Sequence, residues 1–294
     1  MRISTAYQFE TYAGDIRLAN DRLAKAGKQV STGKQLLKPS DNPLGSTRTL
    51  TLRSYRAATD QYESNITSAK GILGYSEEAL SSLHNGIKRA YTLAVQGANT
   101  STDQAGRNAM AQEISDIQAR LVQIGNSRGP SGQYIFAGQD NGSAPYSASG
   151  SGITFSGDTN PVLVEASPSE TIQVNTISEP LFSNIYNSLE TLKNNLLGGN
   201  VGAISGTSIN DMQAALNSIS SERGAVGVKL RQVQDYSEQY TRRVDDLTAG
   251  ISDIEDVDVT TAIMNYQLAQ TAYEAALRVA SQGYQLSLMD FIQG

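Results

Sequence analysis

The sequence predicts a mainly α-helical protein with a small β insert. We expect a long coiled-coil-like helical bundle that pairs the N- and C-terminal segments, with an antiparallel β domain in the middle. Along most of the 294 residues, apolar side chains recur every three or four positions, the spacing of a helix face that packs on another helix. The two ends of the chain carry matching stripes. Between residues 133 and 179 this spacing stops, and Gly, Ser, Thr and Pro become frequent.

The terminal stripes are the most regular feature. The N-terminal stripe consists of Phe9, Tyr12, Ile16, Ala19, Leu23, Ala26 and Val30. The C-terminal stripe consists of Val259, Ile263, Tyr266, Tyr273, Leu277, Ala280, Tyr284, Leu288 and Phe291. Because such a stripe needs a partner helix to leave water, the simplest arrangement pairs the first helix with the last.

A break separates the first stripe from the next helix. Pro39 and Pro43 flank a Ser-Asp-Asn sequence that favours a turn. Asn42 is placed to cap a helix that restarts at Pro43. Further helices are expected over about 49–97 and 103–127, each with its own apolar stripe.

The middle of the chain predicts four or five short strands. Strand-like runs occupy 134–136, 153–155, 162–164 and 171–174, with turn residues between them. A helix follows over 181–197, then a loop over 198–208, and then the longest stripe, over 209–254. Gly224 and Gly227 weaken that helix locally, but the unbroken stripe predicts that packing overrides them.

This layout predicts three domains. Residues 1–42 and 256–294 form a terminal coiled-coil domain, residues 43–132 and 180–255 a central helical bundle, and residues 133–179 the β domain. Further apolar residues lie off the terminal stripes: Ile3, Tyr7, Leu18, Leu268, Leu286, Met289 and Ile292. One helix pair covers only one face of each helix, so we expect this remainder to meet other subunits.

Composition excludes several function classes. The net charge of −6 disfavours nucleic acid as a partner. The chain has no cysteine and one histidine, His84, beside a helical stripe, and it lacks the glycine-rich and nucleophile motifs of common enzymes. The acidic run 253–258 has Asp258 where a calcium loop needs Gly, and therefore indicates an acidic first turn of the last helix. We predict no enzyme activity, no cofactor and no metal.

Targeting signals are equally sparse. The N-terminus has no apolar core of the signal-peptide kind, and no stretch approaches the ~18 apolar residues of a membrane-spanning helix. We therefore expect no membrane partner. The protein is expected either to stay in the cytosol or to leave the cell without a cleaved signal peptide.

Several sequence segments resemble the flagellin superfamily, and within it the members that join hook to filament. Residues 29–34 (QVSTGK) and 39–43 (PSDNP) are similar to an N-terminal family segment that usually has Asp where this chain has Asn42. Residues 132–138 (GQYIFAG) and the C-terminal segment, which ends 286–291 (LSLMDF), resemble the junction members.

The resemblance implies a structural, non-enzymatic role at the hook–filament junction, outside the bacterial cell, after export without a cleaved signal peptide. It implies a homo-oligomeric ring, with hook-associated protein 1, flagellin and an export chaperone as further partners. The terminal helices are expected to pack against neighbouring subunits. The expected interface residues are Phe9, Tyr12, Ile16, Leu23, Val30, Ile263, Tyr266, Tyr273, Leu277, Tyr284, Leu288 and Phe291.

Three alternatives remain open at this stage. The nearest is a filament flagellin with a small outer domain, which would polymerise by itself. A secreted enzyme or glycan-binding module would use the β insert, whose few aromatic residues and scattered carboxylates match no motif. A cytosolic coiled-coil adaptor would not need two matched terminal stripes.

Overall fold

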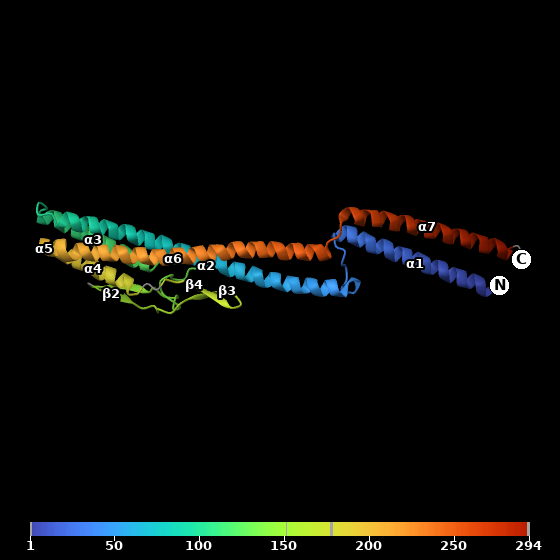
Figure 1. The fold of residues 1–294 in the computed structure, drawn as a ribbon, viewed down its shortest axis with the longest axis horizontal. Coiled ribbons are helices and arrows are strands. Elements are labelled where there is room, and N and C mark those ends of the chain that lie inside the picture. The colour runs from blue at the N-terminus through green and yellow to red at the C-terminus, as the bar shows by residue number, and fades with distance from the viewer. Residues whose placement is uncertain (1, 151, 177–178, 293–294) are drawn as a thin grey trace. The chain divides into compact units, whose positions relative to one another are not determined.

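The computed structural model describes residues 2–150, 152–176 and 179–292, and the side chains of residues 2–6, 8 and 284–292 lie outside this description. Long helices dominate and two short β hairpins lie in the middle of the chain, which confirms the predicted fold class (Figure 1). The chain divides into two compact units. Unit 1 comprises Met1–Ala58 and Arg243–Gly294, and unit 2 comprises Thr59–Arg242. The boundary lies within two continuous helices, so the three-domain division stays a prediction.

The helices follow the apolar stripes closely. They are α1 (Arg2–Thr32), the 3₁₀ turn η1 (Pro39–Asp41), α2 (Pro43–Gly97), α3 (Gln104–Gly125), α4 (Leu181–Leu197), α5 (Val201–Ala203), the π-helical turn η2 (Ile204–Ser208), α6 (Ile209–Glu255) and α7 (Val259–Ile292). Asn42 caps α2 as predicted, because its side-chain oxygen accepts the N–H of Gly45 at 2.9 Å. The expected loop 198–208 is instead largely helical, with Asn200 accepting the N–H of Ala203.

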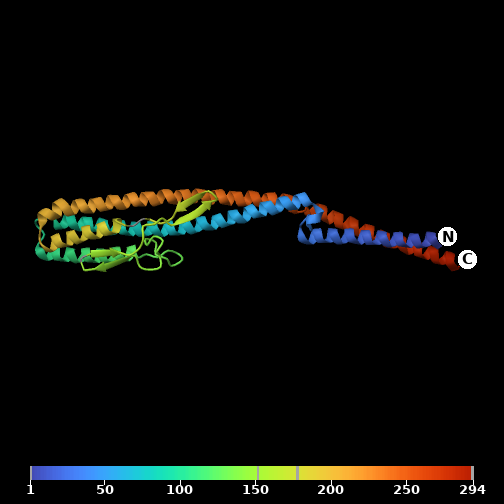
Figure 2. The same ribbon diagram turned by 90° about the horizontal axis from the view of Figure 1, so that it is seen from below.

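Unit 2 is a four-helix bundle. The parts of α2 and α6 that belong to it run alongside α3 and α4 (Figure 2). Its core combines aliphatic residues from all four helices with aromatic residues from the segment between α3 and α4. The largest fully buried side chains are Tyr146, Phe136, Phe182, Ile66, Leu73, Leu80, Leu83, Ile87, Leu93, Ile114, Leu121 and Ile185.

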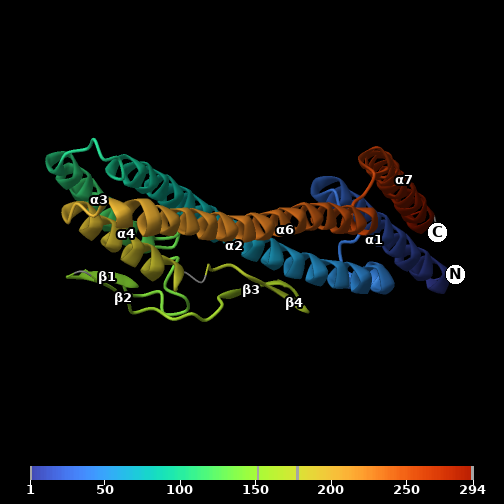
Figure 3. The ribbon, with the colours of Figure 1, turned by 60° about the vertical axis from the view of Figure 1, so that its left-hand side comes forward.

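The β insert has four strands in the described part of the chain, in line with the predicted four or five. It contains two separate antiparallel hairpins, β1 (Tyr146–Ser149) with β2 (Gly152–Phe155) and β3 (Leu163–Ser167) with β4 (Glu170–Gln173). Both lie on one side of the bundle (Figure 3). The run 134–136 is not a strand, because Ile135 and Phe136 are both buried and the in-and-out alternation of a strand is lost.

The hairpins are fixed to the helices by specific contacts. The Tyr240 hydroxyl donates a hydrogen bond to the Ala166 carbonyl, and the Asn65 amide donates one to the Glu165 carbonyl at 3.1 Å. A hydrogen bond to the Glu170 carboxylate raises the pKa of Tyr236 to about 12. Unit 2 therefore satisfies its apolar and polar groups largely within the chain.

Candidate assembly surface

Helices α1 and α7 of unit 1 lie side by side and run antiparallel (Figure 1). Two close contacts fix their register. A methyl group added at Gly283 would lie 2.7 Å from the Tyr12 ring, and one added at Gly27 would lie 3.5 Å from the Tyr266 ring. Tyr12 near the start of α1 thus lies beside Gly283 near the end of α7. Gly27 near the end of α1 lies beside Tyr266 near the start of α7. The predicted pairing of the first helix with the last is present in the structure.

Small residues fill the interior of this pair. Ala26, Ala262 and Ala280 are the buried apolar residues of α1 and α7 in the described part of the chain, with Ala262 only 1% exposed and Ala280 only 3%. Ala269, Tyr273 and Ala276 are half-buried and continue the same face of α7 at steps of three and four. Since small side chains let two helix backbones approach closely, the pair packs tightly while burying little apolar area.

The stripe predicted on α7 is correct in part, because its members Tyr273 and Ala280 lie on the face that meets α1. Ile263 and Leu277 are each 42% exposed, and Val259 is exposed too, so these three members do not lie at the centre of that face. The inner positions beside Ile263 and Leu277 are the preceding residues, Ala262 and Ala276, and neighbouring positions on a helix are about 100° apart. The larger aliphatic side chains are left on the adjacent surface.

The predicted interface residues divide into three groups. Phe9, Tyr12, Ile16, Leu23 and Tyr273 are half-buried within unit 1. Val30, Ile263, Tyr266 and Leu277 are exposed. The side chains of Tyr284, Leu288 and Phe291 lie outside the described residues. Their common role as a subunit interface stays a prediction.

Other exposed apolar residues extend this outer surface. These residues are Leu268, which is 72% exposed, and Tyr7, Leu18, Val259, Met264 and Val279. Tyr7, Leu18 and Leu268 were predicted from their positions off the stripes and Val259 as a member of the C-terminal stripe, whereas Met264 and Val279 were not singled out. Over residues 259–283 the only charged side chains are Glu274 and Arg278. We call Ile263, Met264, Leu268, Leu277 and Val279 the outer face of α7.

Two segments of the chain meet through polar contacts where α1 and α6 end. We call residues 33–42 and 254–258 the elbow. Lys34 and Asp256 form an antiparallel bridge, and the Val257 N–H donates to the Gly33 carbonyl at 2.9 Å. The Gln35 N–H donates to the Glu255 carbonyl at 2.7 Å. Gly33 has a φ of 67°, a left-handed conformation that favours glycine after a helix.

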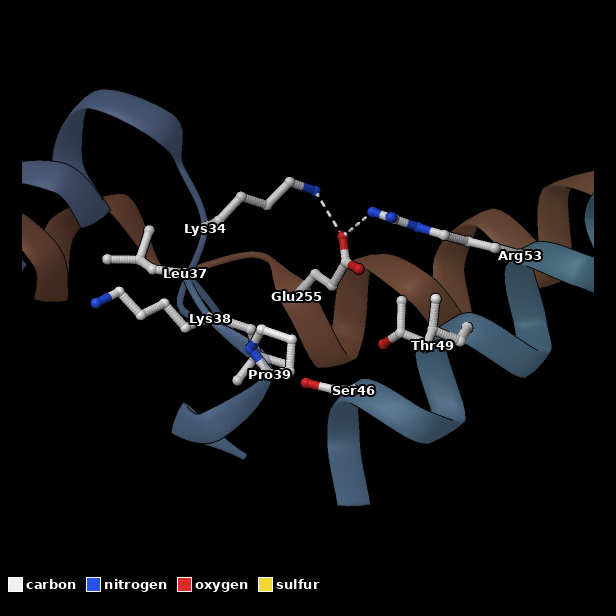
Figure 4. A pocket seen from close by; sticks show the side chains of 10 residues that line it. Lys34, Leu37, Lys38, Pro39, Ser46, Thr49, Arg53 and Glu255 are labelled. Carbon is white, nitrogen blue, oxygen red and sulfur yellow. Dashed lines mark hydrogen bonds and ion pairs between the residues drawn. The ribbon is translucent and has the colours of Figure 1, made fainter. Parts of the chain in front are cut away.

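Ion pairs hold the two chain segments of the elbow together (Figure 4). The Glu255 carboxylate lies 3.3 Å from the Lys34 ammonium and 2.7 Å from the Arg53 guanidinium. Lys34 also lies 2.6 Å from Asp256. The hydrogen bond from Lys34 lowers the pKa of Asp256, and the same bond raises the pKa of Lys34. Sequence reasoning missed these pairs because their members lie more than 200 residues apart.

The acidic run 253–258 was predicted to form an acidic first turn of the last helix, but α7 begins at Val259 and has no acidic residue in its first turn. Asp258 caps α7, because its side-chain oxygen accepts the N–H of Thr260 at 2.8 Å and that of Thr261 at 3.3 Å. Among the residues that the structure describes, no group of three or more His, Asp or Glu side chains is placed to hold a metal ion. Within the same residues, no helix has the length and apolar character needed to cross a membrane.

Two hollows flank the elbow loop. One, of about 270 Å³, is lined by Leu37, Leu50, Thr49, Arg53 and Glu255 among others. The other, of about 620 Å³, lies between α1 and the loop. It is lined by Asp21, Ala24, Lys25, Lys28, Thr32, Leu37, Lys38 and Asp41. We call this second hollow the basic hollow.

Comparison with known proteins places the chain among flagellar proteins. Residues 3–141 match the bacterial flagellin N-terminal helical region, and residues 209–292 match the bacterial flagellin C-terminal helical region. Flagellar hook-associated protein 3 of Escherichia coli is 25% identical over 312 residues, which cover 98% of this chain and 98% of that protein. Polar flagellin F of Vibrio parahaemolyticus is 25% identical over 120 residues, or 41% of this chain and 32% of that protein.

A solved structure has the same fold. The flagellar junction protein FlgL from Legionella pneumophila superposes with a TM-score of 0.62 at 14% sequence identity. The superposition covers 71% of this chain and 100% of that one.

Proposed function

This chain belongs to the bacterial flagellin family, and from that premise we propose that it joins the flagellar hook to the filament. The role is structural: the terminal helices would pack laterally and axially against neighbouring subunits. Hook-associated protein 3 matches this chain over nearly the whole length of both proteins, which supports this role.

The observation that carries the proposal is the outer face of α7. Ile263, Leu268 and Leu277 are exposed although they are as large as residues that unit 2 buries completely. Burying one such side chain is worth about 1.5–3 kcal/mol, so a neighbour that covers this face gains considerable free energy. Among the described side chains of α1 and α7, only alanines are fully buried, so large apolar side chains such as Leu268 stay available to that neighbour.

The proposed partners are of two kinds. Other copies of this chain would form a homo-oligomeric ring. Hook-associated protein 1 on the hook side and flagellin on the filament side would contact the ring axially. An export chaperone would cover α7 before assembly, because a charge-poor helix with exposed aliphatic residues needs protection in the cytoplasm.

The proposed location is the flagellum outside the cell, reached by export without a cleaved signal peptide. A chain without cysteine cannot be cross-linked during export in an unfolded form. The long uninterrupted helices can re-form locally after transport, since helical contacts are short-range.

A filament flagellin is the alternative, and the extent of similarity argues against it. The similarity to polar flagellin F covers 41% of this chain, compared with 98% for hook-associated protein 3. Self-assembly separates the two functions. At high concentration, a flagellin forms long filaments by itself, and a junction protein does not.

The experiment that tests the proposal is Leu277→Asp in the full chain, expressed in a strain that lacks the original copy. A carboxylate on the outer face of α7 would have to be buried without a partner, so the ring should not form and filaments should not stay attached. Attached filaments are counted by electron microscopy, and the chain secreted into the medium is measured alongside.

Leu163→Asp is the matched control. Leu163 is also an exposed leucine, but it lies on β3 of unit 2. This variant should keep filaments attached. The proposal fails if Leu277→Asp supports attached filaments at the level of the original chain, or if a strain without the chain keeps its filaments.

A further inference from the structure

Basic and acidic residues are concentrated in two different sequence segments of unit 1. Residues 22–56 contain eight basic side chains and one acidic side chain, Asp41. Residues 244–277 contain seven acidic side chains and no basic one. The whole chain has a net charge of only −6, so this separation is local.

Pairing inside the chain uses only part of these charges. In the basic segment, residues 22–56, Lys34 and Arg53 pair with Glu255, and Lys25 pairs with Asp41 at 3.0 Å. Lys28 and Lys38 are exposed and make no ion pair with any described residue. In the acidic segment, residues 244–277, Asp246 and Asp253 are likewise exposed and form no ion pair within the described chain.

Two of the unpaired cations lie together. Lys28 and Lys38 both line the basic hollow, one from α1 and the other from the elbow loop. Asp21 and Asp41 line it as well, but Asp41 already accepts hydrogen bonds from Lys25 and from the N–H groups of Leu37 and Lys38. The hollow therefore offers two ammonium groups to an incoming carboxylate.

Two of the unpaired carboxylates also lie together. Asp246 and Asp253 are seven residues apart on α6 and so share one face of that helix. The opposite face carries Ile251, which is buried. This pair of carboxylates forms an acidic ridge that points away from the interior of unit 1.

We propose that the acidic ridge of one copy, Asp246 and Asp253, docks against the basic hollow of the next copy at Lys28 and Lys38. The proposal rests on the ring assigned above and names its lateral contact. Every copy carries both halves, so the contact joins different surfaces of identical subunits. Such a head-to-tail contact closes into a ring when its rotation is right. The apolar outer face of α7 would supply affinity, and the charges would set orientation and reject wrong partners.

Charge reversal in the full chain tests the contact. The variants are K28E/K38E on the basic side, D246K/D253K on the acidic side, and the chain with all four substitutions. Each is expressed in a strain that lacks the original copy, and the chain retained on isolated hooks is measured relative to the amount exported. K88E/D116K is the matched control, because Lys88 and Asp116 are exposed in unit 2 and form no ion pair with described residues.

Like charges meet in either two-residue variant, so retention should fall by about tenfold or more. The four-residue variant restores opposite charges between copies and should recover to within about twofold of the original chain. The control should be unchanged. If a two-residue variant is retained normally, the proposed contact is wrong. If the four-residue variant stays as low as its parents, the partner of the hollow is not a second copy, and the proposal also fails.

Folding and function are controlled separately. Circular dichroism of each purified variant checks helicity, and the single variants K38E and D253K replace any pair that loses it, with the same expected directions. Normal retention of the original chain together with normal retention of the variants overturns only the lateral contact. Absence of the original chain from the hook would overturn the junction function itself.

Discussion

Unit 1 and unit 2 are both helical, yet they bury apolar side chains to very different degrees. In the described part of unit 1, the buried apolar residues are Ala26, Ile251, Ala262 and Ala280. Unit 2 buries large residues such as Phe136, Tyr146 and Phe182 completely. Since a fully buried large side chain contributes about 1.5–3 kcal/mol, unit 2 has the means to fold on its own contacts. The pair α1–α7 gains much less from its internal contacts.

The difference shows how one sequence pattern can serve two purposes. The stripes of unit 2 are satisfied within the chain, and their aliphatic residues form one continuous core. In the α1–α7 pair of unit 1, the fully buried described side chains are alanines, larger residues such as Tyr12 are half-buried, and others such as Leu268 are exposed. Ordering a helix pair costs conformational entropy, and a small internal interface offsets little of that cost. We therefore expect the α1–α7 pair to become fully ordered only among neighbouring subunits.

The largest effect should come from the core of unit 2. Phe182 is fully buried, and its ring lies 5.1 Å from the rings of Phe136 and Tyr146. Phe182→Ala should lower the free energy of unfolding of the isolated chain by about 3–5 kcal/mol, through lost burial and the cavity left behind. Urea denaturation followed by circular dichroism measures this.

Leu277→Ala is the counterpart in unit 1. Because Leu277 is 42% exposed in the single chain and so only partly buried, its truncation should lower the free energy of unfolding by about 1 kcal/mol. The same substitution should nevertheless reduce filament attachment. Equal destabilisation by the two variants would contradict the contrast between the units.

An effect between these two is expected where α1 and α7 approach closely. Gly283→Ala places a methyl group 2.7 Å from the Tyr12 ring, which should weaken the pairing by about 1–3 kcal/mol. Spin labels at Asn20 and Ala275, introduced as the only cysteines of the chain, report the separation of the two helices. A wider or broader distance distribution is the expected result.

Gly224→Ala is the control for that substitution. Gly224 lies in α6 with open space around it, so the added methyl group should stabilise the helix by up to about 1 kcal/mol. An unchanged distance distribution in Gly283→Ala would show that the Tyr12 contact does not set the register of the pair.

The smallest effect concerns the pH dependence of the elbow. The pKa of Asp256 is lowered by Lys34, so the contribution of this pair is complete above the ordinary pKa of 3.8 and is lost as the pH falls through the lowered value. The pKa of Lys34 is raised above 10.5, so at the alkaline end the contribution is lost as the pH rises through that raised value. Amide hydrogen exchange at Gln35, referenced to an amide of unit 2, should stay constant between these limits. A change near neutral pH would assign the elbow's stability to other groups.

Much of the fold was predictable because it depends on local spacing. The helices, the break at Pro39–Asp41 and the Asn42 cap follow from residue types a few positions apart. The β insert was predictable in place but not in pairing. Ile135 and Phe136 read as a strand, yet both enter the core of unit 2.

For the candidate site, the sequence by itself determined that the two terminal helices carry matching stripes and belong together. The tertiary structure alone decided which residues of α7 meet α1. Ala262 and Ile263 are neighbours on the helix, and a heptad pattern cannot separate two faces only about 100° apart. Close backbone approach selects the smaller residue for the inside and leaves the larger one exposed. The ion pairs of Lys34 with Glu255 and Asp256 were also decided by the fold, since it brings together segments more than 200 residues apart.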